Sequence, residues 1–376
     1  MSQDTLNIAL LGHRFMGRAH SNAWLQSTHF FDPKLKPVLK VACGRDEADL
    51  QAFADRWGWE EIETDWKKVI ARDDIDVIDI ALPTFMHAEV AIAAAEAGKH
   101  IFCEKPFANT LEESEAMLAA AKKAGVVHYV NHNYRRCPAV FLAKQMIDEG
   151  ALGEIYHWRG AYQQSWLVNK DHPIDWKLKR KLAAAGPLWD LGSHTIDLAH
   201  FIVGSDFKNL TCQSKNFVTQ RPLAENTEQI ADVEVECAAL MMGEFKNGAL
   251  ASIETTRYAT GRRNRHTFEI YGSKGSLSWD MEDMNRLKYF NQDDPEKTVG
   301  WRDILATERC HDYVKNWWPP GHIIGYEHAF VHAVVDFIDA VADGTSISPD
   351  FSDGVKITRV LEAALESAES GTRVEL

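Results

Sequence analysis

The sequence predicts an α/β protein that opens with a doubly wound parallel sheet and continues into an α+β domain with an open, mainly antiparallel sheet. Two changes of texture support this. Apolar β-rich runs alternate with amphipathic helical runs up to about residue 130, and after about residue 150 strands follow one another directly. The length of 376 residues also suits two domains. We therefore expect domains at residues 1–131 and 132–376.

Short apolar runs that end at turns mark the strands of the first domain. Two of the intervening helical runs stop at Gly98 and Gly125, because glycine ends helices readily. The predicted strands are 6–11, 35–43, 75–82, 100–103 and 126–131. The predicted helices are 16–26, 47–57, 87–97 and 111–124. Parallel sheets of this kind bind ligands at the carboxyl ends of their strands, so the turns after these strands are the places to search.

Consecutive strands dominate the second domain. The tight turn at 272–275 joins two of them and favours antiparallel pairing. The predicted strands are 155–162, 233–242, 250–258, 266–271 and 276–279. The predicted helices are 193–202, 326–341 and 355–368. Residues 291–322 are polar and rich in Trp and Pro, which predicts a long loop.

Composition excludes several classes of protein. Lys and Arg number 41 against 55 Asp and Glu, a formal charge of −14, and this acidic balance disfavours nucleic acids and anionic membranes as partners. No apolar run reaches the ~18 residues of a membrane helix. The six cysteines are scattered, so neither a zinc ribbon nor a disulfide framework is predicted, and a reducing cytoplasm is the simplest location.

The turn after the first strand has the spacing of a dinucleotide fingerprint. Gly12 permits a tight turn and Gly17 permits close packing of helix on sheet, while the helix N-terminus offers N–H groups to a pyrophosphate. Arg14 replaces the usual middle glycine, where it would either crowd the phosphates or bind them. An ordinary strand-turn-helix is the alternative.

The end of the second strand bears on the choice of nucleotide. An acidic residue there normally holds the ribose hydroxyls of NAD, but this chain has Gly44 and Arg45, with Asp46 one position later. A guanidinium pairs well with a 2′-phosphate, so Arg45 favours NADP over NAD. The alternative is that Arg45 is a solvated residue at a helix start.

Two further segments carry acid–base chemistry. Glu104 and Lys105 precede Pro106 at a strand end, where a partly desolvated lysine can donate to a substrate oxygen. In the second domain Asp190 precedes a helix that bears His194, and a carboxylate with an imidazole suits general base chemistry near neutral pH.

Helix capping by Asp190 beside a packed histidine is the structural alternative for this second segment. A metal is a further possibility, because His194, Asp197 and His200 share a helical face. No further carboxylate or cysteine lies at ligand spacing, and we expect no metal site.

Five motifs in order make the chain resemble the Gfo/Idh/MocA oxidoreductases, named for glucose-fructose oxidoreductase and inositol dehydrogenase. The motifs span most of the chain and are together far more specific than any one of them. They are the glycine turn with Met16, Gly17 and His20; Pro83, Thr84 and His87; Glu104-Lys105-Pro106; Asn133-Tyr134-Arg135; and Asp190, Gly192, His194 and Asp197.

The resemblance implies a Rossmann domain that binds NAD(P), followed by a domain whose open sheet commonly mediates homodimers or homotetramers. It also implies a catalytic trio of Lys105, Asp190 and His194. His194 would take the proton from a sugar hydroxyl, Lys105 would hold the reacting oxygen, and Asp190 would hold a neighbouring hydroxyl or tune the other two. The cofactor-binding residues would be Gly12, Arg14, Phe15, Met16, Gly17, Gly44, Arg45, Pro83, Thr84, His87, Glu104, Lys105 and Asn133.

Aromatic residues beside polar ones favour a carbohydrate substrate, because sugar rings have apolar CH faces and hydroxyl edges. The candidate substrate-binding residues are Lys105, Tyr162, Trp166, Trp176, Asp190, His194 and Tyr326, with Gln163, Lys177, His322 and Glu327 nearby in sequence. The segment 175–192 resembles relatives that oxidise cyclic sugars, anhydrosugars or glycosides at a ring hydroxyl. A cyclitol is also compatible, and a 3-keto sugar is the leading product.

Three functions follow from this resemblance. The first is a reversible NAD(P)-dependent sugar or cyclitol dehydrogenase. The second is a glycosidase that oxidises its substrate transiently and retains NAD(H). Arg14 in the glycine turn would fit the unusually tight cofactor binding that this function needs. The third is a nucleotide-dependent sensor without turnover, which the intact Lys105, Asp190 and His194 disfavour.

Overall fold

The computed structural model describes residues 4–376 and divides into two units. Unit 1 comprises Met1–Arg136 and Ile324–Val355, and unit 2 comprises Cys137–Ile323 and Lys356–Leu376. The first predicted domain thus falls within unit 1. The second is divided, because a late segment of the chain returns to unit 1.

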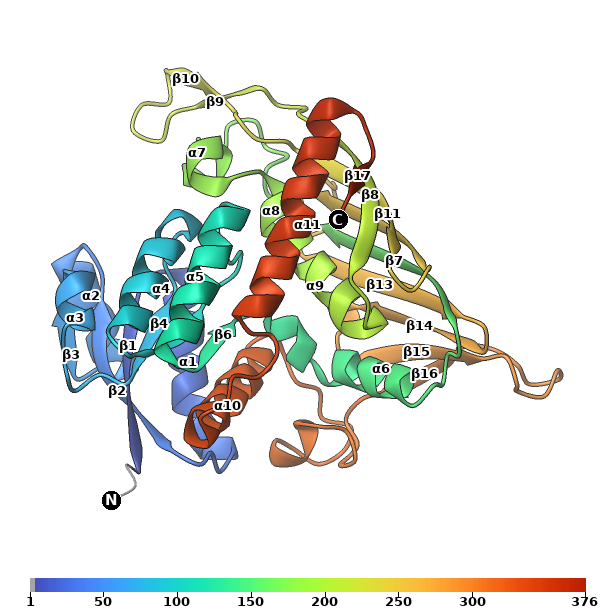
Figure 1. The fold of residues 1–376 in the computed structure, drawn as a ribbon, viewed down its shortest axis with the longest axis horizontal. Coiled ribbons are helices and arrows are strands. Elements are labelled where there is room, and N and C mark those ends of the chain that lie inside the picture. Colours follow the sequence, from blue (N-terminus) through green and yellow to red (C-terminus); the bar gives the residue numbers. More distant parts are fainter. Residues whose placement is uncertain (1–3) are drawn as a thin grey trace. The chain divides into compact units, whose positions relative to one another are not determined.

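A six-stranded parallel sheet forms the centre of unit 1 (Figure 1), in the order β3-β2-β1-β4-β5-β6. The order reverses between β1 and β4, which is where open sheets of this kind bind ligands. The strands are β1 (Thr5–Leu11), β2 (Lys36–Cys43), β3 (Glu61–Glu63), β4 (Val77–Ile80), β5 (His100–Cys103) and β6 (His128–Val130).

Helices of unit 1 begin and end at residues suited to those positions. Asp46 and Thr110 accept backbone N–H groups at the starts of α2 and α5, and Gly58 and Gly125 end the same helices in the left-handed conformation. The late helix α10 packs against α1. The helices are α1 (Phe15–Phe30), α2 (Glu47–Trp57), α3 (Trp66–Ile70), α4 (His87–Glu96), α5 (Leu111–Ala124) and α10 (His328–Asp343), with 3-10 turns η1 (Thr84–Met86) and η2 (Asn133–Arg136).

A nine-stranded sheet forms unit 2, in the order β16-β15-β14-β13-β7-β12-β11-β8-β17. Its strands pair antiparallel except β7 with β12, which are parallel. The strands are β7 (Ile155–Gln163), β8 (Phe207–Lys215), β11 (Ala238–Phe245), β12 (Leu250–Thr256), β13 (Arg265–Gly272), β14 (Gly275–Asp280), β15 (Arg286–Asn291), β16 (Arg302–Leu305) and β17 (Val374–Glu375). A small antiparallel pair joins β9 (Gln220–Pro222) to β10 (Ile230–Asp232).

Helices pack on one face of this sheet. The helix α9 contacts β7 and β12, α8 contacts β11 and β12, and α6 contacts β14 and β15. The helices are α6 (Pro138–Asp148), α7 (Arg180–Ala183), α8 (Pro187–Asp190) and α9 (Gly192–Val203), with 3-10 turns η3 (Trp176–Leu178), η4 (Met281–Asp283) and η5 (Val314–Asn316). The last helix, α11 (Phe351–Ser370), runs across the boundary of the two units in sequence.

Two predicted segments differ in the structure. The strand expected at 233–242 begins only at Ala238, because Val233 and Val235 instead pack into a small apolar cluster with Leu167 and Ile174. The loop expected at 291–322 contains β16, whose register against β15 extends the sheet. Several elements were not predicted: β3, β8, β9, β10, β15, β17, α3 and α6.

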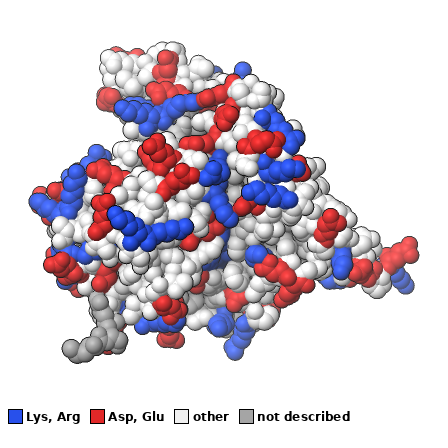
Figure 2. Space-filling view, in the orientation of Figure 1, with Lys and Arg blue, Asp and Glu red and all other residues white. Residues whose placement is uncertain are grey.

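The surface carries charges of both signs. Figure 2 shows Lys and Arg interspersed with Asp and Glu on the face that it displays. None of the helices within residues 4–376 has both the length and the apolar character to cross a membrane. The six cysteines are free, and five of them are buried.

Candidate active site

The glycine turn after β1 is shaped by close backbone approaches. Gly12 has a φ of +106°, and a Cβ atom there would overlap the carbonyl oxygen of Ala81 at the end of β4. A Cβ on Gly17 would overlap the carbonyl oxygen of Gly12. Both positions therefore require glycine, and the N-terminus of the 16-residue helix α1 comes directly after the turn.

Arg14 stands at the N-terminus of α1 but points along the surface. Its guanidinium lies 3.2 Å from the carboxylate of Asp49 in the first turn of α2, and both side chains are more than half exposed. Exposed ion pairs are worth little, so Arg14 retains freedom to turn toward a phosphate. The side chain of Phe15 beside it is 60% exposed.

Histidine fills the space beside the end of β2. The ring of His13 lies where a Cβ on Gly44 would stand, and its edge contacts Phe53. Burial, together with the charge of Arg14, lowers the pKa of His13. Asp46 caps α2 by accepting the N–H of Asp49 at 3.0 Å.

His87 joins two loops at the carboxyl edge of the sheet. It is buried, and its Nδ1 faces the carbonyl of Pro106 at 3.0 Å while its Nε2 faces that of Leu82 at 2.9 Å. Burial lowers the pKa of His87. The adjacent Thr84 is buried in η1. His87 thus ties the loop after β4 to the loop after β5.

A buried ionic network lies directly behind Lys105. His20 contacts Asp79 through Nδ1 at 2.7 Å and Glu104 through Nε2 at 2.8 Å. Burial alone would lower the pKa of His20, but the charges and hydrogen bonds of the two carboxylates outweigh it and raise the pKa to about 10. His20 is therefore a cation that donates to both carboxylates. Glu104 also accepts from Asn131 at 2.7 Å, and its other oxygen accepts the backbone N–H of Lys105 at 3.1 Å.

The Asn133-Tyr134-Arg135 motif forms η2 just beyond β6. Asn133 is buried, and its amide nitrogen has no hydrogen-bond partner within residues 4–376. A buried donor without a partner is costly, and a ligand oxygen would satisfy it. The ring of Tyr326, predicted to bind substrate, lies 6.5 Å from that of Tyr134 and 5.1 Å from that of Phe330, all within unit 1.

These features fit a dinucleotide. The backbone forms a cradle at Gly12 and Gly17 that a side chain would fill, and α1 presents its N-terminus there. Asn133 offers an unused buried donor at the same edge of the sheet. The cofactor-binding residues predicted from sequence lie in the loops that follow β1, β2, β4, β5 and β6 or in the first turn of the helix after the loop.

In unit 2, Asp190 and His194 lie on consecutive short and long helices. Asp190 is the last residue of α8 and is partly exposed, whereas His194 in the first turn of α9 is buried. The ring of Tyr162 packs 5.6 Å from His194 and stacks on His266 at 4.6 Å. Burial lowers the pKa of His266 to about 3, so it stays neutral beside the candidate base.

Charged and aromatic groups surround Asp190. The Nη2 atom of Arg257 donates to its Oδ2 at 2.8 Å, and the Nζ of Lys177 lies 3.9 Å from the same oxygen. Both cations lie over the ring of Trp166, and Lys177 also lies over that of Trp176. The structure thus brings together four residues that the sequence associated with substrate, and it adds Arg257.

The sheet also separates residues that the sequence placed together. Tyr162 and Gln163 are adjacent on β7 and point to opposite faces. Tyr162 is buried beside His194, whereas Gln163 bonds Glu254 on the open face. His322 and Glu327 are exposed in the structure.

The metal alternative gains no support from geometry. Within residues 4–376, no group of three His, Cys, Asp or Glu side chains is placed to hold a metal ion. The ring of His200 instead packs against Phe207.

Sequence reasoning missed the partners that hold these residues. Asp79 was signalled by a carboxylate in the middle of an apolar strand, and His20 appeared in a motif without a role. Arg257 and Glu236 carried no local signal, because their partners at Asp190 and at the turn before α8 lie far away in sequence.

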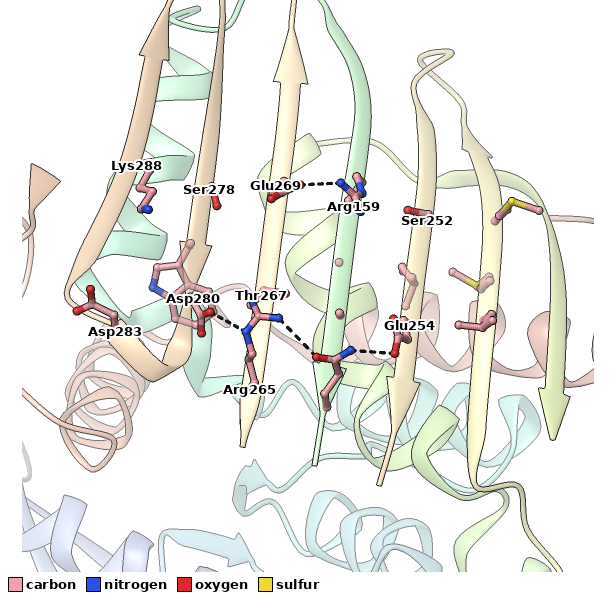
Figure 3. Close-up of a pocket in the computed structure, with 18 of the residues that line it drawn as sticks. Arg159, Ser252, Glu254, Arg265, Thr267, Glu269, Ser278, Asp280, Asp283 and Lys288 are labelled. Atoms are coloured by element: carbon pink, nitrogen blue, oxygen red, sulfur yellow. Dashed lines mark hydrogen bonds and ion pairs between the residues drawn. The ribbon is translucent and has the colours of Figure 1, made fainter. Parts of the chain in front are cut away.

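The open face of the unit 2 sheet lines a separate concavity, whose volume is about 670 Å³. Figure 3 shows ion pairs and hydrogen bonds running across its strands. Arg159 bonds Glu269 at 3.0 Å, and Arg265 bonds Asp280 at 2.8 Å. Exposed Leu240 and Met242 add an apolar part to this face.

Comparison with known proteins finds a matching family model for each of the two units. Residues 6–132 match the family model described as an oxidoreductase family with an NAD-binding Rossmann fold, and residues 140–278 match the Gfo/Idh/MocA C-terminal domain. Levoglucosan dehydrogenase of Pseudarthrobacter phenanthrenivorans is 39% identical, over 99% of this chain and 98% of its own.

Solved structures agree along the whole chain. An oxidoreductase domain protein from Kribbella flavida is 45% identical with a TM-score of 0.96, and levoglucosan dehydrogenase in complex with NADH and L-sorbose is 40% identical with a TM-score of 0.96. Each comparison covers 99% of both chains. The matches in both units, together with the dinucleotide cradle and the aspartate–histidine pair, show that this chain is an oxidoreductase of the Gfo/Idh/MocA family.

Proposed function

We propose that the protein oxidises a ring hydroxyl of a cyclic carbohydrate to a ketone, with an anhydrosugar as the leading substrate. The class includes sugars, glycosides, anhydrosugars and cyclitols. The observation that carries the proposal is the cluster in unit 2, where Asp190 lies beside Lys177, Trp166 and Trp176, close in sequence to the buried His194. Aromatic faces beside charged groups suit sugar rings, and a relative of full length oxidises levoglucosan by its name.

Three residues carry the proposed chemistry. His194 takes the proton of the reacting hydroxyl as general base, and the neutral His266 beside it adds no competing charge. Lys105 holds the oxygen and stabilises the negative charge that develops on it. Asp190 accepts a hydrogen bond from a neighbouring hydroxyl. The chemistry that a bound nicotinamide would supply is acceptance of the hydride from the same carbon.

For the cofactor we propose NAD. The sequence favoured NADP through Arg45, but the N-cap Asp46 and the first-turn residues Glu47 and Asp49 of α2 add three carboxylates directly after that position. Negative charges repel a 2′-phosphate. A solved structure of levoglucosan dehydrogenase is a complex with NADH and L-sorbose, which supports this choice.

For the assembly we propose a homodimer or homotetramer formed through the open sheet face. Its exposed Leu240 and Met242, flanked by cross-strand ion pairs, are unusual for a surface that faces only water. The partners proposed for this chain are thus a small carbohydrate and further copies of itself. A cytoplasmic location remains a prediction from the cysteine pattern.

A panel assay tests the proposed reaction. Purified protein is mixed with NAD or NADP and with levoglucosan, free sugars, inositols and glycosides, and the absorbance of the reduced nicotinamide is followed. We expect it to rise with NAD and a cyclic sugar. A flat trace with cleavage of a glycoside would instead support the retained-cofactor glycosidase, and nucleotide binding without either reaction would support a sensor.

A further inference from the structure

Arg257 is an almost completely buried cation one residue beyond β12. Its side chain is 1% exposed, and its Nη2 donates to Asp190 at 2.8 Å. The Nε and Nη1 atoms have no hydrogen-bond partner within residues 4–376. A guanidinium is costly to bury without a carboxylate partner, so its place here depends on the bond to Asp190.

A buried carboxylate, Glu236, lies at the other end of α8 from Asp190. Glu236 accepts the N–H groups of Gly186 and Leu188 at 2.9 Å each, at the turn that opens α8. Burial raises the pKa of Glu236, while these two hydrogen bonds and the charge of Arg257 act in the opposite direction. Glu236 therefore holds the start of α8, and Arg257 holds its last residue, Asp190.

Lys177 offers a contrast on the other side of Asp190. Its side chain is 37% exposed and its Nζ lies 3.9 Å from Oδ2, beyond hydrogen-bond distance. A partly solvated ammonium at this distance orients the carboxylate less than the planar guanidinium of Arg257, which is buried and hydrogen-bonded to Asp190. Orientation of Asp190 thus depends on Arg257.

We propose that Arg257 is the positioning residue of Asp190: its buried guanidinium holds the carboxylate in one orientation as a hydrogen-bond acceptor for the carbohydrate. This inference rests on the proposed function of Asp190. Arg257 acts through Asp190 and takes no part in proton or hydride transfer. Its effect on the reaction therefore requires that Asp190 is present.

A double-mutant cycle tests this dependence. The holoenzyme and its R257M, D190N and R257M/D190N variants are assayed with NAD and levoglucosan. We expect R257M to lower kcat/KM about 100-fold. The kcat/KM of the double variant should lie within about threefold of that of D190N, since the effects of residues that act as a unit are not additive. Losses that multiply in the double variant would overturn the proposal.

Matched variants separate positioning from loss of folding. R257K keeps the charge, and we expect its kcat/KM to be about tenfold higher than that of R257M. R221M removes another buried arginine of unit 2, which bonds the backbone carbonyls of Asn169 and His172 and not Asp190. We expect R221M combined with D190N to show independent losses. Equal behaviour of the two arginines in the cycle would refute a specific link to Asp190.

A readout without turnover keeps the inference apart from the proposed function. If the wild-type protein oxidises no carbohydrate in the panel, the proposed function fails, and the same four proteins are compared by thermal unfolding. We expect D190N to lower the Tm strongly because it leaves a buried cation unpaired, and R257M in that background to restore part of the loss. Tm losses that simply add would show that the two side chains are not coupled and would end the proposal.

Discussion

Lys105 and His194 differ in their surroundings, but both are expected to act directly on the reacting hydroxyl. We predict that Lys105→Met and His194→Ala each reduce turnover by about a thousandfold, because each removes a proton-transfer or charge-stabilising group. NADH affinity, measured by fluorescence titration, should change less than about threefold, since neither residue forms the glycine turn.

Lys123→Met provides the control for the lysine substitution, because Lys123 lies exposed in the last turn of α5. Its turnover should match the wild type. Undiminished turnover in both Lys105→Met and His194→Ala would contradict the assignment of the catalytic residues.

His20 gives a residue-scale prediction about pH. Asp79 and Glu104 raise its pKa to about 10 against burial, from the model-compound value of 6.5. A raised pKa contributes stability that is fully present below pH 6.5 and is lost as the pH rises through about 10. We predict that His20→Gln lowers the free energy of unfolding by ~3 kcal/mol at pH 6, the cost of breaking a buried ion pair.

The difference between wild type and His20→Gln should shrink steadily as denaturant unfolding is repeated from pH 6 to pH 10. His29→Gln, an exposed change in the last turn of the same helix, should leave unfolding unchanged across this range. A difference that stays constant to pH 10 would show that His20 is not held as a cation.

At the scale of elements, the contact between β1 and α1 depends on glycine. A Cβ at Gly17 overlaps the backbone carbonyl of Gly12, and no side-chain movement relieves a clash with backbone. We predict that Gly17→Ala displaces the start of α1 and weakens NADH binding at least tenfold, by about 1.4 kcal/mol or more. Isothermal titration of NADH measures this loss.

Gly300→Ala is the matched control, because a Cβ at Gly300 meets no atom within 4 Å. Its NADH affinity and its Tm should equal those of the wild type. Normal NADH binding by Gly17→Ala would mean that the turn adapts and that the dinucleotide cradle is placed wrongly.

Elements with explicit ends could be predicted closely from sequence. The helices 47–57 and 111–124 match α2 and α5 because Asp46 and Thr110 start them and glycine ends them. The strands β15 and β16 at one end of the nine-stranded sheet were missed, since their charged, half-exposed residues lack the apolar pattern of a core strand. β11 starts late because side chains from other segments draw Val233 and Val235 away from the sheet.

At the scale of the whole molecule, motifs predicted which residues belong to the site, but not what holds them. The residues of the glycine turn are close together in sequence, as are Asp190 and His194. In the structure each of these two segments forms a single turn or helix start. Asp190 and Arg257 lie 67 residues apart, and His20 and Glu104 lie 84 apart. Such pairings arise from packing, which neither spacing nor periodicity encodes.

The open sheet face carries the last prediction, which concerns assembly. Leu240 and Met242 alternate with buried residues of β11 and are 55% and 67% exposed. If this face joins two copies, the interface removes these side chains from water. Two carboxylates placed there would be buried opposite the same carboxylates of the second copy, and their repulsion would oppose association. We predict that light scattering finds the wild type at a multiple of 42.4 kDa and the double variant Leu240→Asp, Met242→Asp at 42.4 kDa.

Ile230→Asp supplies the comparison, because Ile230 is 63% exposed on β10, outside the nine-stranded sheet. It adds the same charge to an apolar surface residue and should leave the assembly intact. NADH affinity should be unchanged in both variants, since β11 belongs to unit 2 and the glycine turn to unit 1. If the double variant still forms the oligomer, or if the wild type is a monomer, the open face is not the interface. Its cross-strand ion pairs would then be exposed surface pairs that contribute little to stability.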